Sequence, residues 1–267
     1  MGIKGRIIHR LPHRKTIQPI KNHIYNTSIR NIFFDLDDTI IITQERYNNA
    51  TKKCIKIMEE EFGLDKEERK NIKLAFKTYD AKRMIELKKF NINRFTYSWY
   101  DVYEEYCERF DKEINPSVKR KIKDITTDVW SPPFDIYEGV VETIKSLKTE
   151  FPISKIHILT LGDPDVQKEK IKSLPEEVRN HIDRIYVVEN KSQKTFERVL
   201  KGLNPERCVM IGNSERSDIE PALNVGMKAI HMKNPTWELD KKKINTNHDN
   251  YNHTNDFTEI KEILQQL

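Results

Sequence analysis

The sequence of 267 residues lacks any apolar run close to the roughly 20 residues that a membrane-spanning helix needs. Charged residues make up 33% of the chain, and its mean hydropathy is −0.74. We therefore expect a well-solvated protein with no membrane partner. The length is enough for one large domain, or for one domain with a second inserted into it.

Cysteine is also scarce, with only Cys54, Cys107 and Cys208 in the whole chain. Their odd number and wide spacing exclude a disulfide framework and a cysteine-ligated metal site. Each lies in an apolar or helical pattern. We expect all three to be packing residues of a protein from a reducing compartment.

Acidic residues are absent from the first 34 positions, which carry seven Lys or Arg. The rest of the chain has 40 basic and 42 acidic residues, so the net charge of +5 comes from this N-terminal arm, residues 1–29. The arm lacks the long apolar segment of a secretory signal, and we expect it to be disordered or organelle-targeting. The predicted location is cytoplasmic, with an organelle matrix as the alternative. The arm also lacks interleaved aromatic and basic residues, which argues against a nucleic-acid partner.

The remainder of the chain changes its periodicity twice. A short apolar strand at 31–34 is followed by helical patterns at 44–62, 67–88, 98–110 and 117–127. After two prolines at 132–133, strands alternate with helices, and the strands are expected at 156–160, 184–188, 208–211 and 228–231.

This alternation predicts an α/β fold with a Rossmann-like parallel sheet core and helices on both faces. The predicted domains are an α/β core at 30–43 and 131–240, an inserted all-helical domain at 44–130, and a polar loop with a C-terminal helix at 241–267.

Three carboxylates follow the first strand directly in the stretch FFDLDDTI, residues 33–40. Open α/β sheets bind ligands at the carboxyl ends of their strands. Asp35, Asp37 and Asp38 together require a cation, and clustered oxygens suit Mg²⁺. A plain turn or a helix N-cap is the alternative explanation.

The next strand ends contribute further polar groups. Thr160 and Gly162 offer a hydroxyl and main-chain N–H groups to a phosphate oxygen, and Asp163 with Pro164 also fits a helix N-terminus. Lys191 follows the third strand. After the fourth strand, Asn213 and Asp218 supply oxygen ligands, while Ser217 and Glu220 have the spacing of a capping box.

These segments, DLDDT, ILTLGD, the loop with Lys191 and GNSERSDI, resemble the haloacid dehalogenase superfamily. The resemblance covers residues 31–40 and about 137–237. The stretches GDPDVQKEKI, NKSQKTF and PTWE are similar to a branch of that superfamily composed mostly of phosphatases. Members carry a helical cap between the first and second motifs, which is where residues 44–130 lie.

The resemblance implies a Mg²⁺-dependent hydrolase of a small phosphorylated metabolite. Asp35 would be the nucleophile that forms an aspartyl-phosphate, Asp37 the general acid and base, and Lys191 the group that offsets negative charge. The implied phosphate-binding residues are Thr39, Thr160, Leu161 and Gly162. The implied metal ligands are Asp35, Asp37, Asn213 and Asp218.

Two positions depart from the usual superfamily pattern: Asn213 replaces an aspartate, and Asp38 replaces a common glycine. A neutral ligand at Asn213 leaves open a non-catalytic binding protein. A haloacid dehalogenase is disfavoured because Asp37 supplies a proton donor that dehalogenation does not need. A phosphatase acting on nucleic-acid ends depends on a role for the basic arm. The oligomeric state is not predicted.

Overall fold

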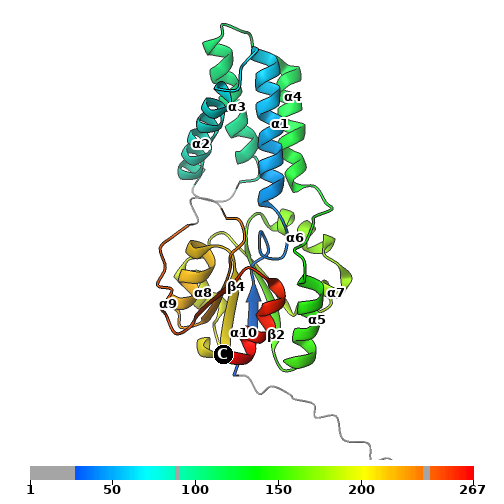
Figure 1. The fold of residues 1–267 in the computed structure, drawn as a ribbon, viewed down its shortest axis with the longest axis vertical. Coiled ribbons are helices and arrows are strands. Elements are labelled where there is room, and N and C mark those ends of the chain that lie inside the picture. The colour runs from blue at the N-terminus through cyan, green and yellow to red at the C-terminus, as the bar shows by residue number, and fades with distance from the viewer. Residues whose placement is uncertain (1–27, 88–90, 237–240) are drawn as a thin grey trace, which may run out of the picture.

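The core of the computed structural model is a six-stranded parallel sheet with the order β3-β2-β1-β4-β5-β6 (Figure 1). The structure describes residues 28–87, 91–236 and 241–267, so nearly all of the predicted arm lies outside the described residues. The strands are β1 (Asn31–Phe34), β2 (Lys155–Leu161), β3 (Arg184–Val188), β4 (Cys208–Gly212), β5 (Lys228–Met232) and β6 (Tyr251–Thr254). Because β1 lies between β2 and β4, the residues that follow these three strands meet at one edge of the sheet.

Both faces of the sheet are covered by helices, as the sequence predicted. Ile32 and Phe34 pack in a core that α5 (Val140–Glu150) and α10 (Ile260–Gln266) share. Phe33 points to the opposite core, which α8 (Gln193–Val199) and α9 (Glu220–Asn224) complete. Alternate residues of β1 are therefore buried on opposite faces, which explains why this strand is uniformly apolar after Asn31. The remaining helices of the core are α6 (Pro164–Ser173) and α7 (Glu176–Arg179).

The prediction of only a polar loop and a helix at 241–267 was incomplete, because Tyr251–Thr254 form β6 at the edge of the sheet. Tyr251 is paired with Ala229 of β5 and is buried, and its hydroxyl lies 3.3 Å from Nδ1 of His231. An edge strand needs main-chain pairing on one side only and tolerates polar side chains. Its short polar sequence therefore gave no apolar signal. The predicted C-terminal helix is present as α10.

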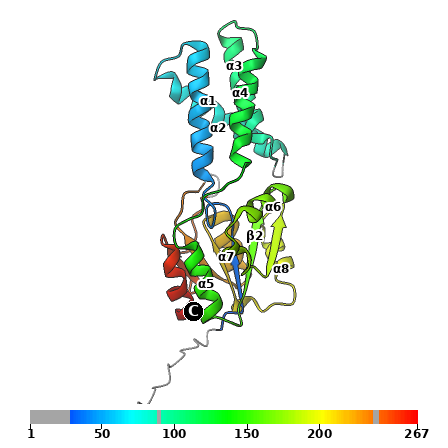
Figure 2. The ribbon, with the colours of Figure 1, turned by 90° about the vertical axis from the view of Figure 1, so that its right-hand side faces the viewer.

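Part of the chain between β1 and α5 forms a separate helical unit, the insertion, that stands over the carboxyl ends of the strands (Figures 1 and 2). Its helices are α1 (Gln44–Phe62), α2 (Glu68–Leu87), α3 (Arg94–Arg109) and α4 (Pro116–Thr127). They surround an apolar core of their own, in which Cys54 and Met58 of α1 meet Trp99 and Tyr103 of α3. No helix in the described ranges has the length and apolar character needed to cross a membrane.

Two links join the insertion to the core, and both are tied to the start of α1. In the first link, the Asp38 carboxylate accepts hydrogen bonds from the N–H groups of Thr43 at 2.9 Å and Gln44 at 2.7 Å. In the second link, the carbonyl oxygens of Ser131 and Pro133 accept hydrogen bonds from Arg46 at 2.6 and 2.8 Å. The base of α1 therefore fixes how the insertion meets the sheet.

Candidate active site

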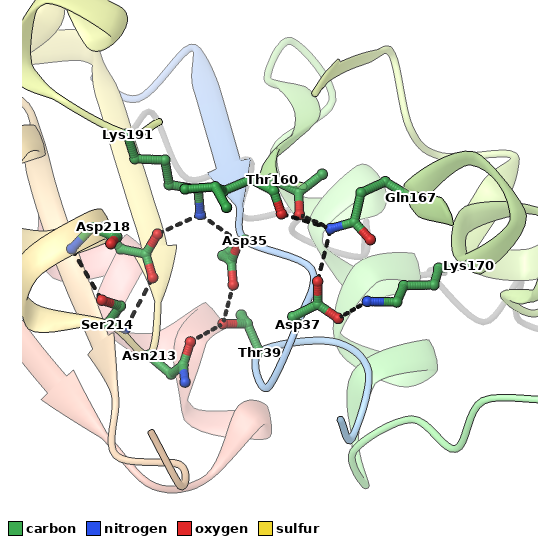
Figure 3. A network of polar contacts seen from close by, with 12 residues as sticks. Asp35, Asp37, Thr39, Thr160, Gln167, Lys170, Lys191, Asn213, Ser214 and Asp218 are labelled. Carbon is green, nitrogen blue, oxygen red and sulfur yellow. Dashed lines mark hydrogen bonds and ion pairs between the residues drawn. The ribbon is translucent and has the colours of Figure 1, made fainter. Parts of the chain in front are cut away.

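A buried lysine joins two carboxylates at the carboxyl edge of the sheet (Figure 3). Asp35 follows β1, and its N–H donates to the carbonyl oxygen of Ile211 at 2.9 Å, which extends the pairing with β4. The Lys191 ammonium donates to Oδ1 of Asp35 and, at 2.6 Å, to Oδ1 of Asp218. The structure thus brings together three of the predicted site residues, although 156 positions separate Asp35 from Lys191.

The charges of this cluster do not balance. Burial raises the pKa of Asp35 to about 8; the attraction of Lys191 opposes this, and the nearby Asp218 and Asp37 add to it. Burial lowers the pKa of Lys191, but Asp218 and Asp35 outweigh burial and raise it above its ordinary value. One ammonium group therefore faces two buried carboxylates. The remaining negative charge favours a second cation at this place.

Asp218 approaches the sheet closely because β4 ends in a glycine. A β-carbon on Gly212 would lie 2.4 Å from Cγ of Asp218, which no side chain there tolerates. The N–H of Ser214 donates to Oδ2 of Asp218 at 2.9 Å. The capping box predicted at Ser217 and Glu220 is wrong, since the turn begins earlier, at Glu215, in a π-helical segment, and Ser214 is its N-cap.

Asn213 presents its amide oxygen to the same cluster. Its Nδ2 donates to the carbonyl oxygen of Pro235 at 3.0 Å, which leaves Oδ1 facing Thr39 at 3.4 Å. The hydroxyl of Thr39 is also 3.4 Å from Oδ2 of Asp35. Thr39 thus links the amide of Asn213 to the carboxylate of Asp35.

The donor atoms in this cluster fit a hard cation such as Mg²⁺. They are the carboxylates of Asp35 and Asp218 and the amide oxygen of Asn213, and hard divalent cations prefer oxygen ligands. Within the described ranges, no group of three or more His, Cys, Asp or Glu could hold a metal ion. The candidate donor set therefore combines two carboxylates with one neutral oxygen, that of the Asn213 amide.

The carboxylate of Asp37 does not join this cluster but turns toward α6 (Figure 3). Nζ of Lys170 donates to its Oδ1 at 2.5 Å, and Nε2 of Gln167 donates to its Oδ2 at 2.8 Å. The structure therefore separates Asp37 from the other predicted metal ligands. Gln167 and Lys170 were not predicted as site residues, although both lie in the stretch GDPDVQKEKI, three residues apart.

The predicted phosphate-binding residues after β2 have partners within the protein. The hydroxyl of Thr160 accepts a hydrogen bond from Nε2 of Gln167 at 2.7 Å, and the carbonyl oxygen of Leu161 accepts one from the same nitrogen at 3.0 Å. The N–H of Gly162 donates to Val188 of β3 at 3.3 Å, so this N–H is already engaged. The Thr160 hydroxyl proton is still able to donate to a ligand. The predicted N-cap of α6 is confirmed, because Asp163 accepts from the N–H groups at 165 and 166.

A cavity of about 640 Å³ lies between the carboxyl ends of the strands and the insertion. Asp35, Asp37 and Lys191 line it from the sheet, while Tyr47 and Arg94 line it from the insertion. Such a volume is in the range of pockets that hold small ligands, roughly 300–1,000 Å³. The carboxylates are therefore accessible to a small molecule.

Comparison with known proteins identifies relatives of this arrangement. The family described as "Hydrolase: haloacid dehalogenase-like hydrolase" matches residues 29–226. N-acylneuraminate-9-phosphatase of Rattus norvegicus is 27% identical over 210 residues, which cover 75% of this chain and 81% of the relative. Glyceraldehyde 3-phosphate phosphatase of Pyrococcus furiosus is 29% identical over 213 residues, covering 77% and 81%.

Solved structures agree on the fold. A haloacid dehalogenase-like hydrolase from Xanthomonas campestris superposes with a TM-score of 0.70 at 22% identity, covering 90% of this chain and 98% of that one. A HAD-hydrolase from Bacillus subtilis, solved with bound magnesium, has a TM-score of 0.59 at 19% identity and covers 88% and 98%. The family match includes β1 to α9 and the insertion between them. The chain therefore belongs to the haloacid dehalogenase-like hydrolases, in the branch whose curated relatives are phosphatases.

Proposed function

We propose that this protein is a Mg²⁺-dependent phosphomonoester hydrolase that acts on a small phosphorylated metabolite through an aspartyl-phosphate on Asp35. The observation that carries the proposal is the buried cluster of Asp35, Lys191 and Asp218 at the floor of the cavity. It combines a carboxylate nucleophile with a fixed positive charge where a phosphoryl group would enter. The phosphatase relatives support the same chemistry.

In the first half-reaction, a carboxylate oxygen of Asp35 attacks phosphorus. The bond between phosphorus and the ester oxygen breaks, and Asp37 gives a proton to the departing alcohol. In the second half-reaction, Asp37 takes a proton from a water molecule whose oxygen attacks phosphorus. The acyl-phosphate bond then breaks, which releases inorganic phosphate and restores Asp35.

The other residues of the cluster act on charge and orientation. Lys191 offsets the repulsion between the Asp35 carboxylate and a phosphate dianion, which otherwise keeps them apart. Thr39 orients Asp35 through its hydroxyl, and Thr160 has a hydroxyl proton to offer to a phosphoryl oxygen. Asp35, Asp218 and Asn213 would hold Mg²⁺, which supplies further positive charge against the phosphoryl oxygens when bound.

The substrate class follows from the size of the cavity and from the relatives. A space of about 640 Å³, closed on one side by the insertion, suits a sugar- or triose-sized phosphate ester. The curated relatives are named for an acylneuraminate phosphate and a triose phosphate. A panel of phosphorylated sugars, sugar acids and trioses incubated with the purified protein, with release of inorganic phosphate as the readout, identifies the preferred ester.

The Asp35→Asn variant tests the mechanism. An amide cannot form an acyl-phosphate in the same way, so we expect hydrolysis of 4-nitrophenyl phosphate to fall by at least about a thousandfold. Circular dichroism and thermal unfolding should match the parent protein, because Asn has the same shape. Turnover near that of the parent would rule out Asp35 as the nucleophile, and full activity in excess chelator would rule out the metal requirement.

A further inference from the structure

Two buried side chains of α6 contact Asp37, the proposed general acid, from the side opposite the cluster of Asp35, Lys191 and Asp218 (Figure 3). Gln167 is 1% exposed and Lys170 is 3% exposed, which is unusual for such polar groups. Each donates to a different oxygen of the Asp37 carboxylate, at 2.8 and 2.5 Å (Figure 3). Residues three apart on a helix share one face, so α6 presents both donors to Asp37 together.

The side chain of Gln167 is held tightly by the end of β2. Its Nε2 lies 2.7 Å from the Thr160 hydroxyl and 3.0 Å from the carbonyl oxygen of Leu161, in addition to its contact with Asp37. An amide nitrogen carries two hydrogens, and here three acceptors surround it. A β-carbon on Gly162 would be 3.0 Å from Cγ and Cδ of Gln167, so the glycine provides the space for this side chain.

The ammonium group of Lys170 contacts two aromatic rings of the second link, the segment between α4 and α5 that connects the insertion to the core. It lies 5.1 Å from the centre of the Trp130 ring and 5.9 Å from that of Phe134, both within the range of cation–π attraction. The ring of Trp130 packs edge-on against Tyr47 of α1 at 5.4 Å. The position of Lys170 is thus set by aromatic residues from the linker and from the insertion.

We propose that Gln167 and Lys170 are positioning residues that hold the Asp37 carboxylate in place for proton transfer; this inference rests on the proposed function. Asp37 lies in the segment that follows β1, and its side chain is 29% exposed in the cavity. Without these two donors, the side chain would therefore sample several rotamers. Proton transfer needs the acid within hydrogen-bond reach of the ester oxygen.

The two donors hold the Asp37 carboxylate beside the cavity, where the leaving oxygen would receive its proton. The same carboxylate must take the proton from water in the second half-reaction. Neither Lys170 nor Gln167 transfers a proton itself, and neither touches the ester.

The test uses the dependence of kcat/KM on the leaving group. Lys170→Met and Gln167→Met preserve the side-chain volume and remove the donors, and Lys172→Met is the matched control because Lys172 is an exposed lysine of the same helix. 4-Nitrophenolate leaves without a proton, whereas an alkoxide requires one. We expect each α6 variant to lose about 10- to 100-fold on the best alkyl phosphate and less than about threefold on 4-nitrophenyl phosphate.

Asp37→Asn is measured in parallel so that two kinds of failure are separated. It should lose even more on the alkyl ester and show the same preference for the better leaving group. If Asp37→Asn shows no such preference, the proposed role of Asp37 as the acid fails. If Asp37→Asn shows it while the α6 variants lose equally on both esters, or lose nothing, the positioning role of Gln167 and Lys170 is overturned. Thermal unfolding of each variant shows whether an equal loss reflects a damaged fold.

Discussion

Lys191 carries one positive charge between two buried carboxylates, and this imbalance governs the chemistry of neighbouring residues. Burial raises the pKa of Asp35 to about 8, so the charged form of this carboxylate needs further positive charge nearby. A divalent cation supplies that charge and stabilises the charged form of both carboxylates. Whatever increases the affinity for the cation should therefore also favour the reactive carboxylate.

Asn213 is the residue where this can be tested, since the amide contributes an oxygen without charge. We expect Asn213→Asp to lower the Mg²⁺ concentration needed for half-maximal activity by on the order of tenfold. The same change removes the hydrogen bond to Pro235, 3.0 Å in the parent, and should reduce stability by about 1 kcal/mol.

Magnesium titrations of activity for the parent protein, for Asn213→Asp and for Asn213→Ala provide the comparison. The alanine variant lacks both the oxygen and the hydrogen bond, so it should need more Mg²⁺ than the parent. An unchanged half-saturation in all three proteins would remove residue 213 from the metal site.

Among the residues of the site, the positions of Asp35, Lys191 and Asp218 could be predicted from the sequence, because the carboxyl ends of parallel strands lie at the same end of the sheet. It did not predict the partners of Asp37. Gln167 and Lys170 look like ordinary polar residues of a surface helix, and their burial depends on how the link after β1 turns toward α6. That turn includes Asp38, which has a φ of 54°. The local sequence pattern does not predict this left-handed conformation for an aspartate.

Asp38 shows how one residue controls a whole element. Its carboxylate accepts from the N–H groups of Thr43 and Gln44 and from the Thr43 hydroxyl, so it caps the first turn of α1. Asp38→Gly keeps the left-handed backbone and removes the cap. We expect it to lower the free energy of unfolding by about 1–2 kcal/mol, as loss of a helix cap typically does.

Asp38→Asn is the matched variant, since asparagine tolerates the same backbone conformation and retains one acceptor oxygen. Its loss should be smaller than that of Asp38→Gly. Thermal unfolding of both variants, followed by circular dichroism, measures the difference. If the glycine variant unfolds at the same temperature as the parent, the cap does not contribute to the stability of α1.

Helices and strands were predicted correctly where the hydrophobic periodicity of the sequence was strong. They were missed where contacts with distant parts of the chain determine the structure. The helices of the insertion were predicted from apolar residues at helical spacing, such as Ala50, Cys54 and Met58 of α1. β6 is four residues of polar sequence that become a strand only because β5 offers an open edge. The π-helical turn at Glu215–Ile219 was also missed, because it is set by the hydrogen bonds of Ser214 and Asp218 rather than by a capping box.

The stability of the whole molecule should depend on pH through a histidine in the centre of the sheet. His157 of β2 is buried, its Nε2 lies 3.2 Å from Oδ1 of Asn31, and its Nδ1 has no hydrogen-bond partner among the residues that the structure describes. Burial lowers the pKa of His157 from 6.5 to about 4. The folded state therefore holds the neutral ring, whereas the unfolded chain takes up a proton below about pH 6.5.

The stability that neutral His157 contributes is therefore complete above about pH 6.5 and is lost as the pH falls toward 4. Between about pH 7 and pH 4 we expect the parent to lose on the order of 2–3 kcal/mol more stability than His157→Gln, which keeps a donor but does not titrate. Denaturant unfolding of both proteins at several pH values measures the difference. Parallel pH curves would show that His157 does not control acid unfolding.

The basic arm is not expected to take part in catalysis. The family match begins at residue 29, and the site residues lie between Asp35 and Asp218. Removal of residues 1–27 should therefore leave kcat/KM for a small phosphate ester unchanged, although it deletes six Lys or Arg.

If the arm instead recruited a polyanion, truncation would weaken activity on a 5′-phosphorylated oligonucleotide and flatten its salt dependence, because each lost phosphate contact reduces counterion release. Assays of both proteins on both substrates at two salt concentrations separate these outcomes. A large loss on the small ester would place the arm within the catalytic domain, contrary to the domain boundary proposed at residue 29.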